Sequence, residues 1–142
     1  MSLDAVRNAL APTGTLRAGI NMANFLLVTG SADNGDPTGV SPSMAAELAR
    51  RLKVPVSYVP YDSPGVLADA AAEGAWDIGN IGAEPARAET IAFTAAYVEI
   101  EATYMVPAGS SIKLIGDVDQ AGVRIAVADR SAYDLWLTRN IK

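Results

Sequence analysis

The sequence predicts an α/β fold in which a mostly parallel sheet carries helices on both faces. Apolar segments typical of strands alternate with segments of helical periodicity, in the order strand, helix, strand, helix, strand, helix. The chain has 142 residues, of which 50% are hydrophobic and 19% are charged. That composition is typical of a globular domain with a buried core.

The first forty residues predict a short helix, a strand and a turn-rich excursion. Residues 4–10 have a helical pattern that stops before Pro12. The segment "TLRAGI", residues 15–20, is typical of a compact strand. Residues 26–40 contain the turn dipeptides Asn34-Gly35 and Asp36-Pro37, so we expect an exposed hairpin there.

The clearest helix is "SPSMAAELARRL", residues 41–52. Ser41 is expected as its N-cap and Pro42 as its first helical residue, where the missing N–H costs nothing. Met44, Leu48 and Leu52 recur every fourth residue and predict its buried face.

The second half of the pattern repeats the alternation. Residues 54–61 predict a strand, and the following helix opens at Ser63-Pro64 and closes at Gly74. Residues 75–82 predict a third strand, and a short helix starts at Pro85.

The C-terminal part of the chain predicts one more strand and one more helix. Residues 123–127 have the strand pattern, and the helix begins near Ser131 with Leu135 and Trp136 on its buried face. Four aromatic residues are expected in the core rather than at a ligand: Trp76, Phe93, Tyr97 and Trp136.

Composition excludes several classes of function. The chain has no cysteine and no histidine, which removes thiolate chemistry, the commonest general base and the commonest metal ligand. We therefore expect no cofactor and no metal. The formal charge is −5 and no basic patch is present, so nucleic acid is not an expected partner. No apolar run is long enough to cross a membrane, and the first residues lack the pattern of a secretory signal.

One arginine stands where such folds bind ligands. Open α/β sheets bind ligands outside the carboxyl ends of their strands, which here predicts residues 21–25 and 80–82. Arg87 follows directly, in the short helix that begins at Pro85, and should lie at the same edge. Its guanidinium offers two parallel donors to a carboxylate. The alternative is an exposed or structurally paired arginine.

Four stretches carry a resemblance to a known family: "GTLRAGI", "GVSPSMAAELARRLKVPVSYVPY", "AEGAWDIGNIG" and "ARAETIAFTAAYVEIEATYMVPAG". With "GVRIAVADRSAYDLWL" after them, the chain resembles the bacterial extracytoplasmic solute-binding proteins of the polar-amino-acid class, which serve ABC transporters. The resemblance implies a type II periplasmic-binding fold of two lobes and a periplasmic or extracytoplasmic location. It divides the chain into a ligand-binding lobe, residues 1–104, and a hinge with an incomplete start of a second lobe, residues 105–142.

The resemblance also implies site residues. Amino-acid-binding members hold the ligand's α-carboxylate with an arginine that is followed, after three residues, by an Ile-x-Phe-Ser/Thr run. Arg87 with residues 91–94 matches this pattern. Ser131 corresponds to a hydroxyl residue that touches the carboxylate, although a plain N-cap explains it equally well. Asn21 stands where an acidic residue often meets the ligand ammonium. The remaining candidates line the strand ends: Asn24, Asn80 and Gly82.

The resemblance implies a binding protein that presents an amino acid or related carboxylate to an ABC-transporter permease, and no enzyme. Two alternatives stay open, a dehydratase or lyase on the same fold and the ligand-sensing domain of a receptor. If the chain ends at Lys142, the unfinished second lobe should expose strand edges and an apolar helix face. We therefore expect self-association through that region.

Overall fold

The computed structural model describes residues 2–141 and places a three-stranded parallel sheet at its centre. The strands are β1 (Leu16–Asn21), β4 (Val56–Tyr61) and β5 (Ile78–Asn80), in the order β4-β1-β5. Residues 16–21 pair with residues 56–61, and residues 18–20 pair with residues 78–80. The chain goes from β1 to one neighbour and then crosses to the other, so the strand order reverses beside β1.

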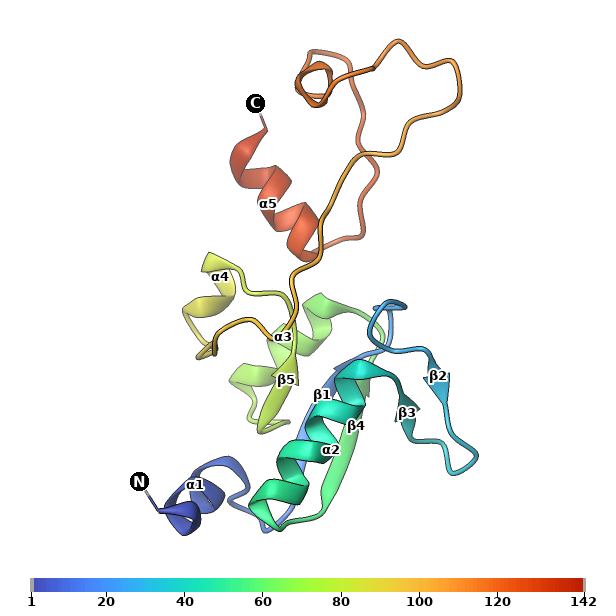
Figure 1. Cartoon of the computed structure of the whole chain (residues 1–142). Helices are drawn as coiled ribbons and strands as arrows, with labels where there is room; N and C mark the ends of the chain where they lie inside the picture. The colour runs from blue at the N-terminus through green and yellow to red at the C-terminus, as the bar shows by residue number, and fades with distance from the viewer. Residues whose placement is uncertain (1, 142) are drawn as a thin grey trace.

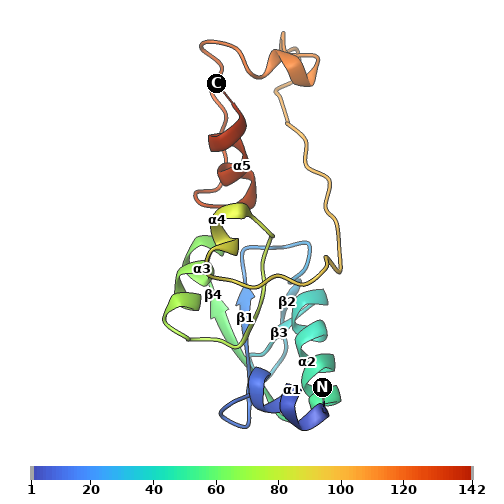
Figure 2. The same ribbon diagram turned by 90° about the vertical axis from the view of Figure 1, so that its left-hand side faces the viewer.

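Helices cover both faces of this sheet, as the sequence predicts. The helices α2 (Val40–Leu52) and α3 (Pro64–Ala72) lie on opposite sides of β1 and β4 (Figures 1 and 2). The helix α1 (Leu3–Leu10) packs at the end of the sheet opposite the carboxyl ends of the strands. The buried apolar core has two clusters, Ala11, Leu16, Ala49 and Leu52, and Ala18, Ile20, Val28 and Ala45.

The helix α2 differs from its prediction in start and in face. It begins one residue early, at Val40 after Gly39, and Ser41 is buried in its first turn instead of capping it. Met44 is 44% exposed, whereas Ala45 is fully buried. Small alanine side chains let the helix approach the sheet closely, so Ala45 and Ala49 are buried in place of Met44, whereas Leu52 of the predicted stripe is buried as expected.

The structure confirms the predicted hairpin and both predicted ends of α3. The predicted hairpin is the antiparallel pair β2 (Gly30–Ser31) and β3 (Pro37–Thr38). The Ser63 hydroxyl accepts a hydrogen bond from the Val66 N–H at 3.3 Å and caps α3. Gly74 has φ +64°, the left-handed conformation expected after a helix end.

Trp76 fills the space across β1 and β5. Its indole Nε1 donates to the Leu67 carbonyl at 2.9 Å, which fixes the ring. A Cβ at Gly19 or at Gly79 would lie 3.1 Å from ring atoms. Both strands therefore need glycine beneath this ring. The predicted core position of Trp76 is consistent with this packing.

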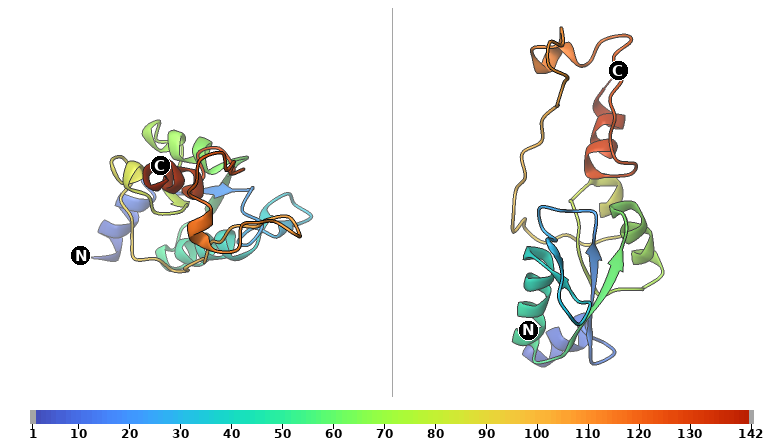
Figure 3. Two further views of the ribbon diagram at one scale, coloured as in Figure 1. Left: turned by 90° about the horizontal axis from the view of Figure 1, so that it is seen from above. Right: turned by 90° about the vertical axis from the view of Figure 1, so that its right-hand side faces the viewer.

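The C-terminal part forms a separate projection. After α4 (Pro85–Ala88) the chain runs away from the sheet to the 3-10 turn η1 (Ile115–Asp117) and returns through α5 (Ala132–Asn140), which lies next to α4 (Figure 3). The predicted strand at residues 123–127 is wrong. A strand needs a partner for its backbone hydrogen bonds, and no strand lies beside it in the described part of the chain. Trp136 is 49% exposed, so its predicted burial is also wrong.

Candidate functional site

The carboxyl edge of the sheet carries a polar cluster of uncharged side chains. Asn80, the last residue of β5, donates from Nδ2 to the Tyr97 hydroxyl at 3.0 Å. The same hydroxyl lies 3.4 Å from Ser41 Oγ in the first turn of α2. Tyr97 is 45% exposed, so the expectation of a core tyrosine is wrong. The hydroxyl instead joins α2 to the end of β5.

Asn21 and Asn24 shape the loop after β1. Asn21 Oδ1 accepts a hydrogen bond from the Ala23 N–H at 3.1 Å. The Asn24 carbonyl accepts from the N–H groups of Leu27 and Val28, at 3.0 and 2.8 Å. Both side chains are partly exposed at the predicted edge. Neither makes a hydrogen bond to Arg87 among residues 2–141.

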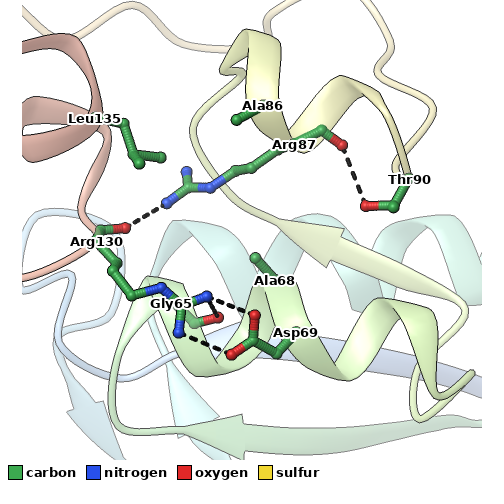
Figure 4. Close-up of a pocket in the computed structure, with 8 residues that line it drawn as sticks. All are labelled: Gly65, Ala68, Asp69, Ala86, Arg87, Thr90, Arg130 and Leu135. Carbon is green, nitrogen blue, oxygen red and sulfur yellow. Dashed lines mark hydrogen bonds and ion pairs between the residues drawn. The ribbon is translucent and has the colours of Figure 1, made fainter. Parts of the chain in front are cut away.

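Arg87 is buried between the sheet edge and the C-terminal projection, with 5% of its surface exposed. Its Nη1 donates to the Gly82 carbonyl at 2.8 Å. Its Nη2 donates to the Arg130 carbonyl at 2.9 Å, as Figure 4 shows. A Cβ on Gly82 would lie 3.1 Å from Ala132 Cβ, so glycine at this position lets α5 approach. The structure thus brings together three predicted residues, Arg87, Gly82 and, directly after Arg130, Ser131.

No carboxylate among the described residues forms an ion pair with Arg87. Its neighbour Glu84 is buried, and Glu84 Oε2 lies 2.6 Å from Arg139 Nη2. That close contact lacks hydrogen-bond alignment, because Oε2 has no hydrogen-bond partner in the described structure. Burial lowers the pKa of Arg87, the Glu84 charge opposes this shift, and the Arg130 charge adds to it. The hydrogen bonds of the buried guanidinium therefore go to two carbonyl oxygens, and Glu84 acts on it only through its charge.

Arg130 links the C-terminal projection to α3. Its Nη1 and Nη2 bind the two carboxylate oxygens of Asp69 at 2.8 and 2.5 Å, and Nη2 lies 3.5 Å from the Gly65 carbonyl. The hydrogen bonds from Arg130 lower the pKa of the Asp69 carboxyl. A cavity of about 170 Å³ lies between α3, α4 and α5. It is lined by Gly65, Ala68, Asp69, Ala86, Arg87, Thr90, Arg130 and Leu135.

Ser131 serves as the N-cap of α5. Its hydroxyl accepts a hydrogen bond from the Asp134 N–H at 3.2 Å, and the residue is 6% exposed. Of the two explanations that the sequence leaves open for Ser131, the N-cap is observed. The hydroxyl proton is still available to a ligand because the cap uses only an oxygen lone pair.

Sequence reasoning missed Arg130, Asp69 and the polar role of Tyr97. Arg130 and Asp69 are 61 positions apart, and no local pattern connects them. The carboxylate of Asp77 binds Arg17 at the amino-terminal end of β5, away from Arg87. No group of acidic residues in the described part could hold a metal ion. None of the described helices has the length and apolar character needed to cross a membrane.

Comparison with known protein families identifies the family of this chain. The model of the bacterial extracellular solute-binding proteins, family 3, matches residues 17–139. The chain belongs to this family. Its mixed α/β architecture, with a parallel sheet and flanking helices, is the type II periplasmic-binding fold that the sequence predicts. No curated protein sequence matches closely enough to add a named relative.

Solved structures of solute-binding proteins resemble this chain over part of their length. An arginine-bound mutant of ArgBP from T. maritima has 22% identity and a TM-score of 0.51, with 68% of this chain and 44% of that chain covered. An ancestral cationic amino acid solute-binding protein has 27% identity and a TM-score of 0.48, with 63% and 37% covered. An ancestral cyclohexadienyl dehydratase has 25% identity and a TM-score of 0.49, with 58% and 34% covered. The chain thus spans less than half the length of each, and the likeness concerns the fold alone.

Proposed function

We propose that this solute-binding protein is the substrate-binding component of an ABC transporter. It binds a small carboxylate-bearing solute such as an amino acid, outside the cytoplasm, and delivers it to a membrane permease without chemical change. Residues 1–104 form the ligand-binding lobe, and residues 105–142 form the hinge and the start of a second lobe. Membership of a family of extracellular solute-binding proteins supports this assignment.

The observation that carries the proposal is the buried, unneutralised guanidinium of Arg87. It is the sole cation among the buried residues that the structure describes, and it lines the cavity between α3, α4 and α5. Carbonyl oxygens bind two of its five N–H donors, which leaves donors for an anion. Burying a charge without a counterion is costly, so a ligand carboxylate would gain a strong partner here.

The proposed site is completed by Gly82, Ser131 and the three asparagines predicted at the strand ends, Asn21, Asn24 and Asn80. The Gly82 carbonyl aims the guanidinium, and the Ser131 hydroxyl has a proton to donate. The asparagines offer neutral donors and acceptors to the rest of the ligand. A carboxylate entering this site would replace the Arg130 carbonyl on Arg87 Nη2.

Calorimetry on the full-length protein tests the proposal, with a carboxylate ligand found by thermal-shift screening. Arg87→Met should weaken binding by about 2–5 kcal/mol, because the desolvated carboxylate loses its charged partner. Arg87→Lys should recover part of the loss, since an ammonium cannot form the bidentate pair. Arg51→Met, at an exposed arginine of α2, is the matched control and should leave affinity unchanged.

Two outcomes would overturn the proposal. Unchanged affinity in Arg87→Met would remove Arg87 from the site. Chromatography of the same mixtures, with prephenate included as a trial substrate, shows whether the ligand is consumed. Consumption would mean that the protein is an enzyme of the dehydratase or lyase class and not a binding protein.

A further inference from the structure

A single residue, Arg130, occupies both ends of the cavity beside Arg87. Its main-chain carbonyl accepts the hydrogen bond from Arg87 Nη2 at 2.9 Å. Its guanidinium binds Asp69 through both carboxylate oxygens, at 2.5 and 2.8 Å. An arginine residue therefore spans the distance from Arg87 to Asp69, with an acceptor at one end and a cation at the other (Figure 4).

The backbone at Arg130 adopts a conformation that arginine does not favour. Its φ is +53°, in the left-handed region where glycine is at ease and a side chain costs free energy. Its side chain also lies so close to α3 that a Cβ on Gly65 would be 3.0 Å from Arg130 Cβ. Strained residues of this kind persist only where surrounding contacts hold them, so the contacts of Arg130 must offset the cost of its backbone conformation.

We propose that Arg87 and Asp69 form the two ends of a subsite for an α-amino acid with a cationic side chain, and that Arg130 occupies this subsite in the ligand-free protein. The Arg87 end rests on the proposed function, whereas the Asp69 end is independent of it. When a ligand displaces Arg130, the ligand carboxylate takes the Arg87 donors and its cationic tail takes the Asp69 carboxylate.

Charge balance favours a cationic tail over a neutral one. Arg130 is the residue that forms an ion pair with Asp69 in the described structure, so its departure leaves that carboxylate without a partner. A guanidinium or ammonium restores the pair, and a guanidinium restores both of its hydrogen bonds. The Arg130 N–H donates to Asp134 at 2.7 Å, but Asp134 belongs to the same helix end and would move with Arg130. Asp134 therefore does not hold Arg130 in the cavity.

The cationic end lies nearer to solvent than the carboxylate end. The side chains of Arg130 and Asp69 are 48% and 58% exposed, whereas Arg87 is 5% exposed. Exposed ion pairs discriminate weakly unless their geometry is bidentate. We therefore expect selectivity of several-fold to tenfold for a cationic tail, superimposed on a larger requirement for the carboxylate.

The test compares L-arginine with L-citrulline, which has the same length and shape but an uncharged urea group. The protein is the full-length chain with Arg130→Gly, because glycine suits φ +53° and removes the guanidinium from the Asp69 end, while the main-chain carbonyl at the Arg87 end is kept. Calorimetry should show arginine binding at least fivefold tighter to Arg130→Gly than to the wild type. In the same variant, arginine should bind at least fivefold tighter than citrulline. Adding Asp69→Asn should bring arginine to the affinity of citrulline.

Matched controls separate this subsite from general charge effects. Arg124→Gly makes the same change at an exposed arginine of the same segment, and Glu73→Gln removes an exposed carboxylate at the end of α3. Both should leave the ratio of arginine to citrulline affinity unchanged. Arg130→Gln, which withdraws the cation and keeps a side chain, is the second variant if Arg130→Gly fails to fold.

Each outcome decides one of the two claims. Equal binding of arginine and citrulline to Arg130→Gly would overturn the cationic subsite and leave the carboxylate anchor intact. Arginine binding that survives Arg87→Met but falls with Asp69→Asn would overturn the proposed carboxylate anchor and keep the Asp69 end. Absence of binding by both amino acids in folded variants would overturn the subsite, while the screened carboxylate ligand still tests Arg87.

Discussion

Replacing Arg87 by methionine should change the stability of the ligand-free protein only slightly, although the residue is buried. The substitution removes two hydrogen bonds from a charged donor, to Gly82 and Arg130 at 2.8 and 2.9 Å. Such bonds contribute about 1.5–3 kcal/mol each, so their loss costs about 3–6 kcal/mol. Methionine also avoids burying a cation without a counterion, an effective penalty of several kcal/mol. Burial lowers the pKa of Arg87, which agrees in sign with this penalty.

These opposing terms leave a net loss of about 1 kcal/mol in the free energy of unfolding. For a chain of this size that corresponds to a melting temperature lower by about 3–5 °C. Urea unfolding followed by circular dichroism, without ligand, measures it directly. A loss above about 4 kcal/mol would refute the reasoning, because Arg87 would then be a structural tether between the lobe and the C-terminal projection. The larger effect should appear only in ligand binding.

Three further predictions concern other parts of the molecule. Hydrogen bonds from Arg50 and Arg51 lower the pKa of Glu47 to about 2, so its stabilising contribution is present above the unfolded pKa and is lost as the pH falls from about 4.5 towards 2. The wild type should lose more thermal stability than Glu47→Gln over that pH window. Gly79→Ala should lower the free energy of unfolding by about 1–3 kcal/mol, because the added Cβ meets the fixed ring of Trp76. Gly116→Ala is the control and should leave that free energy unchanged, because no atom lies within 4 Å of the added Cβ. Equal free energies of unfolding for the two variants would mean that the Trp76 ring moves aside. The 142-residue chain should self-associate at micromolar concentration through exposed apolar side chains such as Leu114 and Ile115, and a compact monomer in sedimentation velocity would contradict this.

Features set by neighbouring residues could be predicted from the sequence. The hydroxyls of Ser63 and Ser131 cap their helices because the N–H groups they accept lie three residues away. Gly74 adopts its left-handed conformation because the chain must leave a helix there. Arg87 lies at the carboxyl edge because parallel strands bring their ends to one side of the sheet. The two caps and Gly74 need only a short window of sequence, whereas the place of Arg87 follows from the alternation of strands and helices over most of the chain.

Features that depend on distant partners could not be predicted. Residues 123–127 have the composition of a strand, but a strand forms only beside another strand, and none is adjacent in the described structure. The buried face of α2 depends on how closely the helix approaches the sheet, and its alanines decided this rather than Met44. The pairing of Arg130 with Asp69 joins segments whose approach also requires Gly65.

The two arginines of the site show that ion pairing depends on the fold and not on closeness in the sequence. Arg130 lies near enough to Arg87 for its charge to lower the pKa of Arg87, yet it presents a carbonyl to that guanidinium and turns its own cation to Asp69. Glu84, three residues before Arg87 in the sequence, pairs with Arg139 instead. Of the three charged residues that line the cavity, Arg130 and Asp69 form an ion pair with each other. The third, Arg87, is buried and has no ion-pair partner among the described residues, in a chain with net charge −5. An anion supplied from outside is the partner that this arrangement lacks.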